Sequence, residues 1–253
     1  MTLTFLGTGT SGGVPSVGCG CKVCHSADPH DRRLRSSALL ETEHTRILID
    51  CGPDFRQQIM PFDFKPLDGV LLTHIHYDHV AGIDDIRPFC VFGAVNIYAD
   101  QTTVDGLKVT MPYCFASHLY PGVPLLALHT IQPHQSFVIG DVTVMPVRVM
   151  HGSMPILGYR FGPLAYITDM KTIDEAEMAY LKGVEVLVVN ALRFEKVHHS
   201  HQLVDDALAF AQRLGARQTY LIHCTHDIGF HDEANSRLPK NVKFAYDGQV
   251  VSL

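Results

Sequence analysis

The densest group of residues able to do chemistry is His74-Ile-His76-Tyr-Asp78-His79. Side chains two positions apart in an extended segment point to the same side, so His74 and His76 can share one metal ion. Asp78 and His79 lie beyond the expected turn and can face a second ion. The spacing therefore predicts a site for two metal ions, against the alternative of a solvated, histidine-rich loop.

Further candidate ligands stand where predicted strands end. Runs rich in Val, Ile, Leu and Tyr lead into His74, His151, Asp169 and His223. Because a sheet fixes its strand ends and leaves the following loops free, ligands from distant parts of the chain can converge at one edge. For Asp169 the alternative is an ordinary turn-forming aspartate.

The order of these residues resembles the metallo-β-lactamase superfamily, whose signature is His-x-His-x-Asp-His followed by His, Asp and His ligands. The resemblance covers the chain from Leu3 to Val250. It implies one ion on His74, His76 and His151, a second on Asp78, His79 and His223, and Asp169 as the bridge between them. Two ions held in this way lower the pKa of a shared water, so that hydroxide is available near neutral pH.

The segment Leu48-Ile-Asp50-Cys-Gly52 resembles another motif of the superfamily, an aspartate at a strand end that supports the histidine loop. Asp50 is therefore expected to accept a hydrogen bond from a ligand histidine or from its loop, without binding metal itself. The alternative is an aspartate that begins a turn before Gly52.

A second cluster is Cys19-Gly-Cys21-Lys-Val-Cys24. Three thiolates can bind one zinc ion, but a closed tetrahedral site needs a fourth ligand, for which Cys224 and His226 are the candidates. This combination resembles the PhnP branch of the superfamily, the phosphoribosyl cyclic phosphodiesterases, and the resemblance assigns a structural zinc to Cys19, Cys21, Cys24 and His226. Folding would then depend on zinc. The alternative is a redox-active or merely buried group of cysteines.

A third motif, Val197-His198-His199-Ser200-His201, precedes a predicted helix. A histidine near its normal pKa can protonate the departing oxygen of a phosphodiester. In the PhnP branch and in related tRNA-processing nucleases a histidine just before this helix is the proposed acid. That resemblance assigns the role to His201, with His198 and His199 as alternatives and a helix-capping or surface role for the trio as another.

Three arginines close to the cysteine cluster have two interpretations. Arg32, Arg33 and Arg35 could clamp a substrate phosphate, or they could form a salt-bridged turn with Asp28 and Asp31.

Composition agrees with metal chemistry and excludes other classes. The 253 residues include 16 His and 7 Cys, 46% are hydrophobic, and the net charge is −6. These values exclude a disordered or fibrous protein, and the acidic balance argues against bulk nucleic-acid binding. We find no signal peptide and no apolar run of about 20 residues that could span a membrane. The odd number of closely spaced cysteines argues against a disulfide framework and predicts a cytoplasmic protein.

The elements that must position these residues are those of a mixed α/β protein. Helices are expected over 176–182, where Thr172 and Glu175 form a capping box and Gly183 ends the helix, over 203–214, ended by Gly215, and near His79. The stretch 101–134 reads as a short helix and an irregular loop. Strands are expected at Leu3–Leu6, Ile47–Ile49, Val70–Leu72, Asn96–Tyr98, Val142–Val149, Leu164–Ile167, Val184–Val189 and Thr219–Ile222.

The sequence thus predicts one metallo-hydrolase domain over residues 1–253, with a structural zinc loop at about 18–25. The resemblance implies an αββα sandwich of two mixed sheets flanked by helices. The expected function is hydrolysis of a small phosphodiester, either linear or cyclic, by a metal-bridging hydroxide. Two catalytic Zn²⁺ or Mn²⁺ ions and one structural zinc are expected. His201, Asp78 and Asp169 would be the catalytic residues. Hydrolysis of an ester, thioester or lactone, a non-catalytic metal-dependent sensor, and a homodimer remain open.

Overall fold

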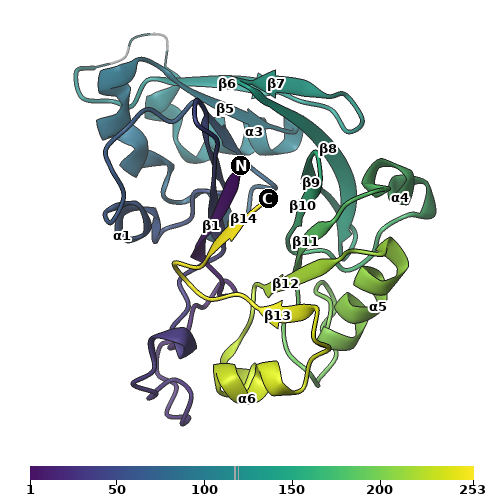
Figure 1. The fold of residues 1–253 in the computed structure, drawn as a ribbon. Coiled ribbons are helices and arrows are strands. Elements are labelled where there is room, and N and C mark those ends of the chain that lie inside the picture. The colour runs from purple at the N-terminus through teal and green to yellow at the C-terminus, as the bar shows by residue number, and fades with distance from the viewer. Residues whose placement is uncertain (117, 119) are drawn as a thin grey trace.

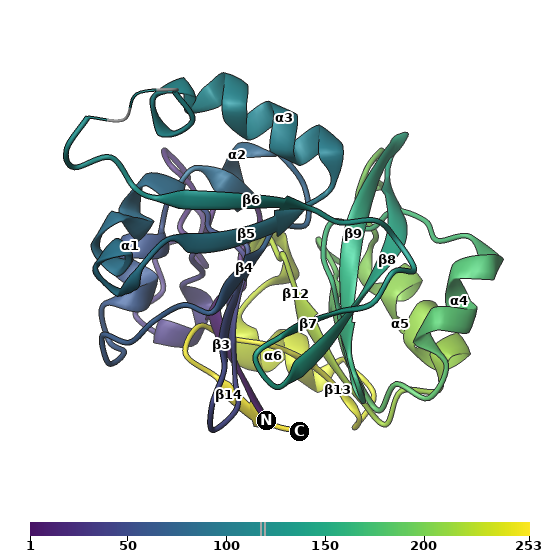
Figure 2. The ribbon, with the colours of Figure 1, turned by 90° about the horizontal axis from the view of Figure 1, so that it is seen from above.

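Two seven-stranded β-sheets pack face to face in the computed structural model, which describes residues 1–116, 118 and 120–253 (Figure 1). Helices lie on the outer side of each sheet, as the view from above shows (Figure 2). Helices α1 (Phe55–Ile59) and α3 (Gln101–Thr110) flank one sheet, and α4 (Glu175–Leu181) and α5 (Val204–Leu214) flank the other. The predicted αββα sandwich is confirmed.

The first sheet has the order β14-β1-β2-β3-β4-β5-β6. Pairings from β14 to β3 are antiparallel, and those from β3 to β6 are parallel. The first and last strands of the chain thus lie side by side. The strands are β1 (Thr2–Gly7), β2 (Ser37–Glu41), β3 (Arg46–Ile49), β4 (Gly69–Leu71), β5 (Val95–Ala99), β6 (Leu126–Thr130) and β14 (Val250–Ser252).

The second sheet has the order β13-β12-β11-β10-β9-β8-β7. Here the pairings from β13 to β10 are parallel, and those from β10 to β7 are antiparallel. Both sheets therefore have a parallel half, whose strands all end at one edge. The strands are β7 (Phe137–Ile139), β8 (Val142–His151), β9 (Met154–Phe161), β10 (Leu164–Ile167), β11 (Val186–Asn190), β12 (Gln218–Ile222) and β13 (Val242–Phe244).

Both faces of the central strands are buried, which explains their unbroken apolar sequences. In β3, Ile47 and Ile49 face the core between the sheets, whereas Leu48 packs under the helices of its own side. In β11, Val188 faces the same inner core and Val189 packs toward α5. Alternate side chains of one strand thus stabilise two different layers.

All eight predicted strands are present, and β2, β6, β7, β9, β13 and β14 were not predicted. Strand β9 contains Pro155 and Gly158, which read as strand breakers in isolation. Its antiparallel ladder with β8, paired from Met145↔Arg160 to His151↔Met154, overrides that local signal. Strand β6 lies in the stretch 101–134 that was expected to form a short helix and a loop; residues 117 and 119 of that stretch lie outside the described residues.

The predicted helices are present, with one correction. Helix α5 ends at Gly215, whose φ of 73° is left-handed, as expected. The capping box at Thr172 is wrong: the N-cap of α4 is Asp174, because the backbone of Thr172 instead pairs with Met150 beside β8. Near His79 there is only a single turn, α2 (Tyr77–Val80).

No helix of the described residues is long and apolar enough to cross a membrane.

Short segments complete the fold. Helix α6, which was not predicted, covers His231–Ser236, and the 3₁₀ segments are Pro29–Asp31 (η1), Ile83–Phe92 (η2), Pro112–Cys114 (η3) and His226–Ile228 (η4).

Candidate metal centres

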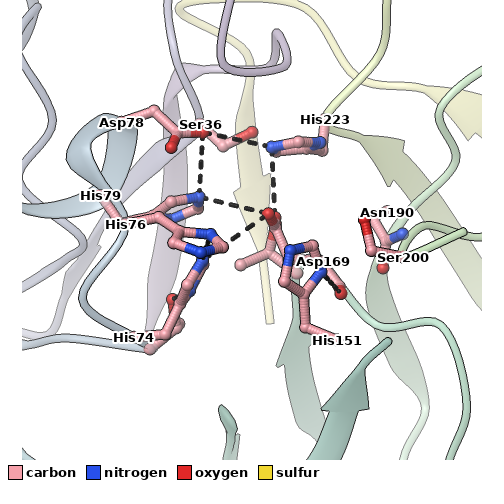
Figure 3. Close-up of polar contacts among 12 residues, drawn as sticks. Ser36, His74, His76, Asp78, His79, His151, Asp169, Asn190, Ser200 and His223 are labelled. Carbon is pink, nitrogen blue, oxygen red and sulfur yellow. Dashed lines mark hydrogen bonds and ion pairs between the residues drawn. The ribbon is translucent and has the colours of Figure 1, made fainter. Parts of the chain in front are cut away.

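Seven candidate ligands meet at the edge where the parallel strands of both sheets end (Figure 3). We call them the sheet-edge cluster: His74, His76, Asp78, His79, His151, Asp169 and His223. The backbones of Asp169 and His223 have positive φ angles of 55° and 56°. Such conformations are costly outside glycine and concentrate at functional sites.

The cluster divides into two groups with Asp169 between them. The ligand atoms of His74, His76 and His151 lie within 4.8 Å of one another, and so do those of Asp78, His79, Asp169 and His223. One Asp169 oxygen, Oδ2, lies 3.8 Å from Nε2 of His74 and 3.5 Å from Nε2 of His79, so it faces both groups (Figure 3). Its other oxygen lies 3.2 Å from Nε2 of His223. The predicted grouping is the one that the geometry brings together.

Hydrogen bonds orient His74, His79 and His151 so that Nε2 points inward. His76 instead presents Nδ1, which lies 2.9 Å from Nε2 of His74. Nδ1 of His79 donates to Asp50 Oδ2 at 2.7 Å, and Nδ1 of His151 donates to the Asp169 carbonyl at 2.7 Å. Nδ1 of His74 contacts the Thr73 hydroxyl at 2.9 Å, and that hydroxyl in turn donates to Asp50. Asp50 therefore has the supporting position expected for it, and these contacts set the tautomers.

The inward nitrogens fit a metal ion. Among the described residues, Nε2 of His79 and both ring nitrogens of His223 are buried without a hydrogen-bond partner. Unpartnered buried polar atoms are costly, and imidazole nitrogens with carboxylate oxygens are a donor set that Zn²⁺ and Mn²⁺ accept. The arrangement can thus hold divalent cations.

Neighbouring charges outweigh burial for two residues of this cluster. Burial would raise the pKa of Asp169, but the neighbouring His223 and His79 hold it well below its usual value. Burial would lower the pKa of His79, but Asp169 and Asp50 raise it well above 6.5. Burial also takes the pKa of His74 well below 6.5. Without a metal ion, a proton on His79 balances the carboxylates.

A separate set of donors, which we call the cysteine cluster, consists of Cys19, Cys21, Cys24 and His226. The three sulfur atoms lie 3.3, 3.5 and 3.2 Å from Nδ1 of His226. Cys224, the other candidate for the fourth position, is buried away from the group, and its backbone pairs with Thr8 and Thr10. The set is the S₃N donor combination of structural zinc sites.

The pKa values of these thiols differ with their surroundings. The backbone N–H of Cys24 donates to the sulfur of Cys21 and lowers the pKa of that thiol. Burial raises the pKa of Cys24 to about 11. All seven cysteines of the chain are free of disulfides.

His201 lies beside Asp169. Its Nδ1 is 4.0 Å from Asp169 Oδ2, and its ring lies 4.8 Å from that of His223 and 4.7 Å from that of His151. Burial, with His223 nearby, lowers the pKa of His201 to about 3, so the expectation of a near-normal pKa is wrong. His198 stacks on His201 at 4.9 Å.

Neither interpretation of the arginines holds for Arg33 and Arg35. Arg33 is buried and donates to the Thr8 hydroxyl and the Ala245 carbonyl. Arg35 pairs with Asp54 at 2.9 Å. Arg33 therefore joins two distant segments, and Arg35 is committed to an ion pair with Asp54.

Sequence reasoning missed residues that support the site. The Asn190 amide binds both backbone groups of Met170, at 2.8 and 3.0 Å, and so fixes the turn that carries Asp169. Asn190 is the last residue of β11, so the strand-end signal used for Asp169 could have found it. Lys171 Nζ donates to the His201 carbonyl at 3.1 Å, and nothing in the sequence pattern marks it.

Comparison with known proteins agrees with this geometry. The Beta-lactamase superfamily domain matches residues 45–224. A solved structure described as a new diphosphatase from the PhnP family is 39% identical with a TM-score of 0.91, and the alignment covers 99% of this chain and 96% of that one.

Two curated relatives are longer proteins. An octanoyltransferase from Porphyromonas gingivalis is 45% identical over 249 residues, which are 98% of this chain and 51% of that protein. A coenzyme PQQ synthesis protein B from Acinetobacter baumannii is 26% identical over 64% of this chain and 58% of its own length. The chain thus spans between half and two thirds of these proteins. With a superfamily domain over most of its length and 39% identity to nearly all of a PhnP-family protein, the chain belongs to the metallo-β-lactamase superfamily, in its PhnP branch.

Proposed function

We propose that this chain is a metal-dependent phosphodiesterase that acts on a small phosphodiester. The observation that carries the proposal is the place of Asp169, which faces two groups of inward-pointing donors and has the His201 ring beside it. The solved relative described as a diphosphatase supports phosphorus–oxygen chemistry. Residues 1–253 would form one hydrolase domain.

In this proposal the sheet-edge cluster holds two divalent ions. His74, His76 and His151 would hold one ion, Asp78, His79 and His223 would hold the other, and Asp169 would be shared between them. Bound ions would supply positive charge to the phosphate oxygens and a water of lowered pKa. Zinc is favoured over manganese by intrinsic affinity, with supply able to change the outcome. The cysteine cluster would hold a third, structural zinc.

His201 is the proposed proton donor to the leaving oxygen. Its pKa of about 3 means that the ring is neutral at pH 7 in the metal-free chain. A phosphodiester bound beside the ring brings a negative charge, which favours the protonated form. The donor matters most when the leaving group is a strongly basic alkoxide, and little when it is a stable phenolate.

The test is a parallel assay of metal-reconstituted protein on three probes: bis(4-nitrophenyl) phosphate, a 2′,3′-cyclic ribose phosphate and an octanoyl thioester. Turnover of the phosphodiesters is expected; turnover of the thioester alone would overturn the proposal. We expect His201→Ala to lower kcat roughly 100-fold on the cyclic phosphate, with metal content unchanged. Unchanged turnover in that variant would remove His201 from the mechanism.

A second candidate is hydrolysis of a carbonyl substrate, because the Porphyromonas gingivalis relative bears the name octanoyltransferase. A binuclear site can also polarise a carbonyl group. That relative is about twice as long as the aligned part, so its name describes more than the region shared with this chain. The thioester probe discriminates between the two candidates, and absence of turnover on every probe would favour a sensor. The cytoplasmic location and the homodimer stay predictions.

A further inference from the structure

The loop that carries the proposed proton donor is held in shape by one arginine. The loop runs from Arg193 to His201, and its ends are closed by backbone hydrogen bonds from Leu192 to Gln202 and from Val204 to Arg193, both at 3.0 Å. Inside the loop, Nε of Arg193 donates to the Lys196 carbonyl at 2.9 Å. Lys196 has a φ of 64°, a left-handed conformation that lysine rarely adopts. The bend at Lys196 is therefore unfavourable by itself and depends on a stabilising contact such as the one from Arg193.

The other end of the same guanidinium reaches the cysteine cluster. NH1 of Arg193 lies 3.4 Å from Asp227 Oδ2, and Asp227 is the neighbour of His226 in sequence. The preceding residue, Thr225, donates both its backbone N–H and its hydroxyl to the Leu192 carbonyl, at 2.9 and 3.2 Å. The two neighbours of His226 in sequence, Thr225 and Asp227, are thus joined to the start of the donor loop by three polar contacts.

The far end of the loop rests on the sheet-edge cluster. Lys171 holds the His201 carbonyl at 3.1 Å, and Gln202 N–H donates to the Met170 carbonyl at 3.2 Å, next to Asp169. A Cβ placed on Gly152, which follows His151, would lie 3.5 Å from the Ser200 side chain, so the loop packs against that turn. The loop therefore spans the two clusters, with Arg193 at one end and His201 at the other.

We propose that Arg193 is a positioning residue for His201 and that it makes the donor loop depend on the cysteine cluster. This inference rests on the proposed function. The guanidinium of Arg193 contacts the Lys196 carbonyl and Asp227, so it acts by fixing the bend at Lys196 and tying it to Asp227. In this way the cysteine cluster, through Asp227 and Arg193, helps to fix the position of His201 relative to Asp169.

The test compares leaving groups. Arg193→Gln should lower kcat on the 2′,3′-cyclic ribose phosphate by roughly tenfold to 100-fold, because small misplacements of a catalytic group are costly. On bis(4-nitrophenyl) phosphate, whose leaving group needs no proton, kcat should stay within about twofold of the wild type. KM should change little on either substrate. Arg193→Lys keeps the charge opposite Asp227 but not the planar fork. Its kcat on the cyclic phosphate should lie between those of Arg193→Gln and the wild type.

Two further measurements accompany the kinetics. Hydrogen exchange of the backbone amides of residues 194–201 should become faster in Arg193→Gln, and elemental analysis should find all metal ions retained. The matched control is Arg217→Gln, which removes an exposed arginine 3.6 Å from Glu185 and should change none of these readouts.

The outcomes separate the two proposals. Equal losses of kcat on both phosphodiesters, or no loss on either, would overturn the positioning role of Arg193. If the wild-type protein hydrolyses neither phosphodiester, the proposed function fails. In that case hydrogen exchange alone decides, and unchanged exchange over 194–201 would overturn the inference.

Discussion

The two donor clusters of this protein are built in opposite ways. In the sheet-edge cluster, His74, His79, Asp169 and His223 are at most 2% exposed. His74, Asp169 and His223 come within three residues of a strand end, and His79 lies in the short helix α2 that follows β4. In the cysteine cluster, the donors are mostly half-buried and three of the four stand in the irregular segment 19–24. The strands and the short helix of the fold position the donors of the sheet-edge cluster. The cysteines of the cysteine cluster lie in a segment without helix or strand.

Hydrogen bonding sharpens this contrast. The sheet-edge histidines are oriented by Asp50, Thr73 and the Asp169 carbonyl, so their inward nitrogens are aligned by the chain itself. In the cysteine cluster, the partners of the sulfur atoms among the described residues are the backbone N–H groups of Ser16 and Cys24 and the ring of His226. Three thiols gathered around one imidazole have few favourable contacts without a cation, so metal binding there should contribute directly to folding.

The largest effect is expected from Asp169→Ala, which removes the carboxylate that both groups share. Activity should fall by roughly 1000-fold or more, because the charge that aligns the two groups is lost. Elemental analysis should find the metal pair disrupted, with the structural zinc retained. Asp63→Ala, at an exposed carboxylate that pairs with Lys65, is the control. Retention of both catalytic ions in Asp169→Ala would contradict the bridging role.

Cys21→Ser should act on stability instead. We expect loss of about one zinc per chain and a fall in Tm of at least roughly 5 °C, since metal binding in such sites is folding energy. The ions of the sheet-edge cluster should stay. The matched control is Cys90→Ser, a half-buried thiol outside the cluster that contacts the Leu125 carbonyl. An unchanged zinc count would show that the cysteines are not ligands.

The contrast also explains what the sequence could predict. Apolar runs that end on a candidate ligand, such as the one before Asp169, predicted both the parallel strands and the sheet-edge cluster. They could do so because the candidate ligands stand just after the strand ends. The cysteine cluster was visible from spacing, yet the choice of His226 over Cys224 came from family resemblance. Only the fold decides it, because Cys224 points into the core.

What remained hidden depends on long-range contacts. Strand β9 has local breakers and forms because β8 pairs with it; Thr172 was misread because its backbone bonds to Met150 rather than capping a helix. Lys171 and Arg193 support the site through backbone carbonyls, which any sequence provides. A contact to a carbonyl leaves no mark in residue types or spacing.

Asp50→Asn gives a smaller effect that probes orientation alone. The amide cannot accept the Nδ1–H of His79 with the strength of a charged acceptor, so the metal affinity of that group should fall about 10- to 100-fold. The fold should tolerate the change because the side chain keeps its size. Competition with a fluorescent chelator measures the affinity, and equal affinities of variant and wild type would mean that Asp50 does not orient His79.

The smallest effect is the release of protons when the sheet-edge cluster binds metal. The pKa of His79 is raised well above 6.5 by Asp169 and Asp50, so this ring stays protonated at pH 7 in the metal-free chain. A ligand nitrogen must be free of its proton, so binding must expel it, whereas His74, whose pKa is lowered, is already neutral and releases none.

Calorimetry of zinc binding to the Cys21→Ser variant, in buffers of different ionisation enthalpy, should therefore find up to about one proton released at pH 7 by the sheet-edge cluster. The apparent affinity should fall as pH falls, because protons compete for His79. The wild type should release further protons, because the thiols of the cysteine cluster must also lose theirs to bind zinc, so the variant isolates the sheet-edge cluster. Binding without proton release at pH 7 would mean that His79 is neutral in the metal-free chain, and that the carboxylates around it are balanced by another group.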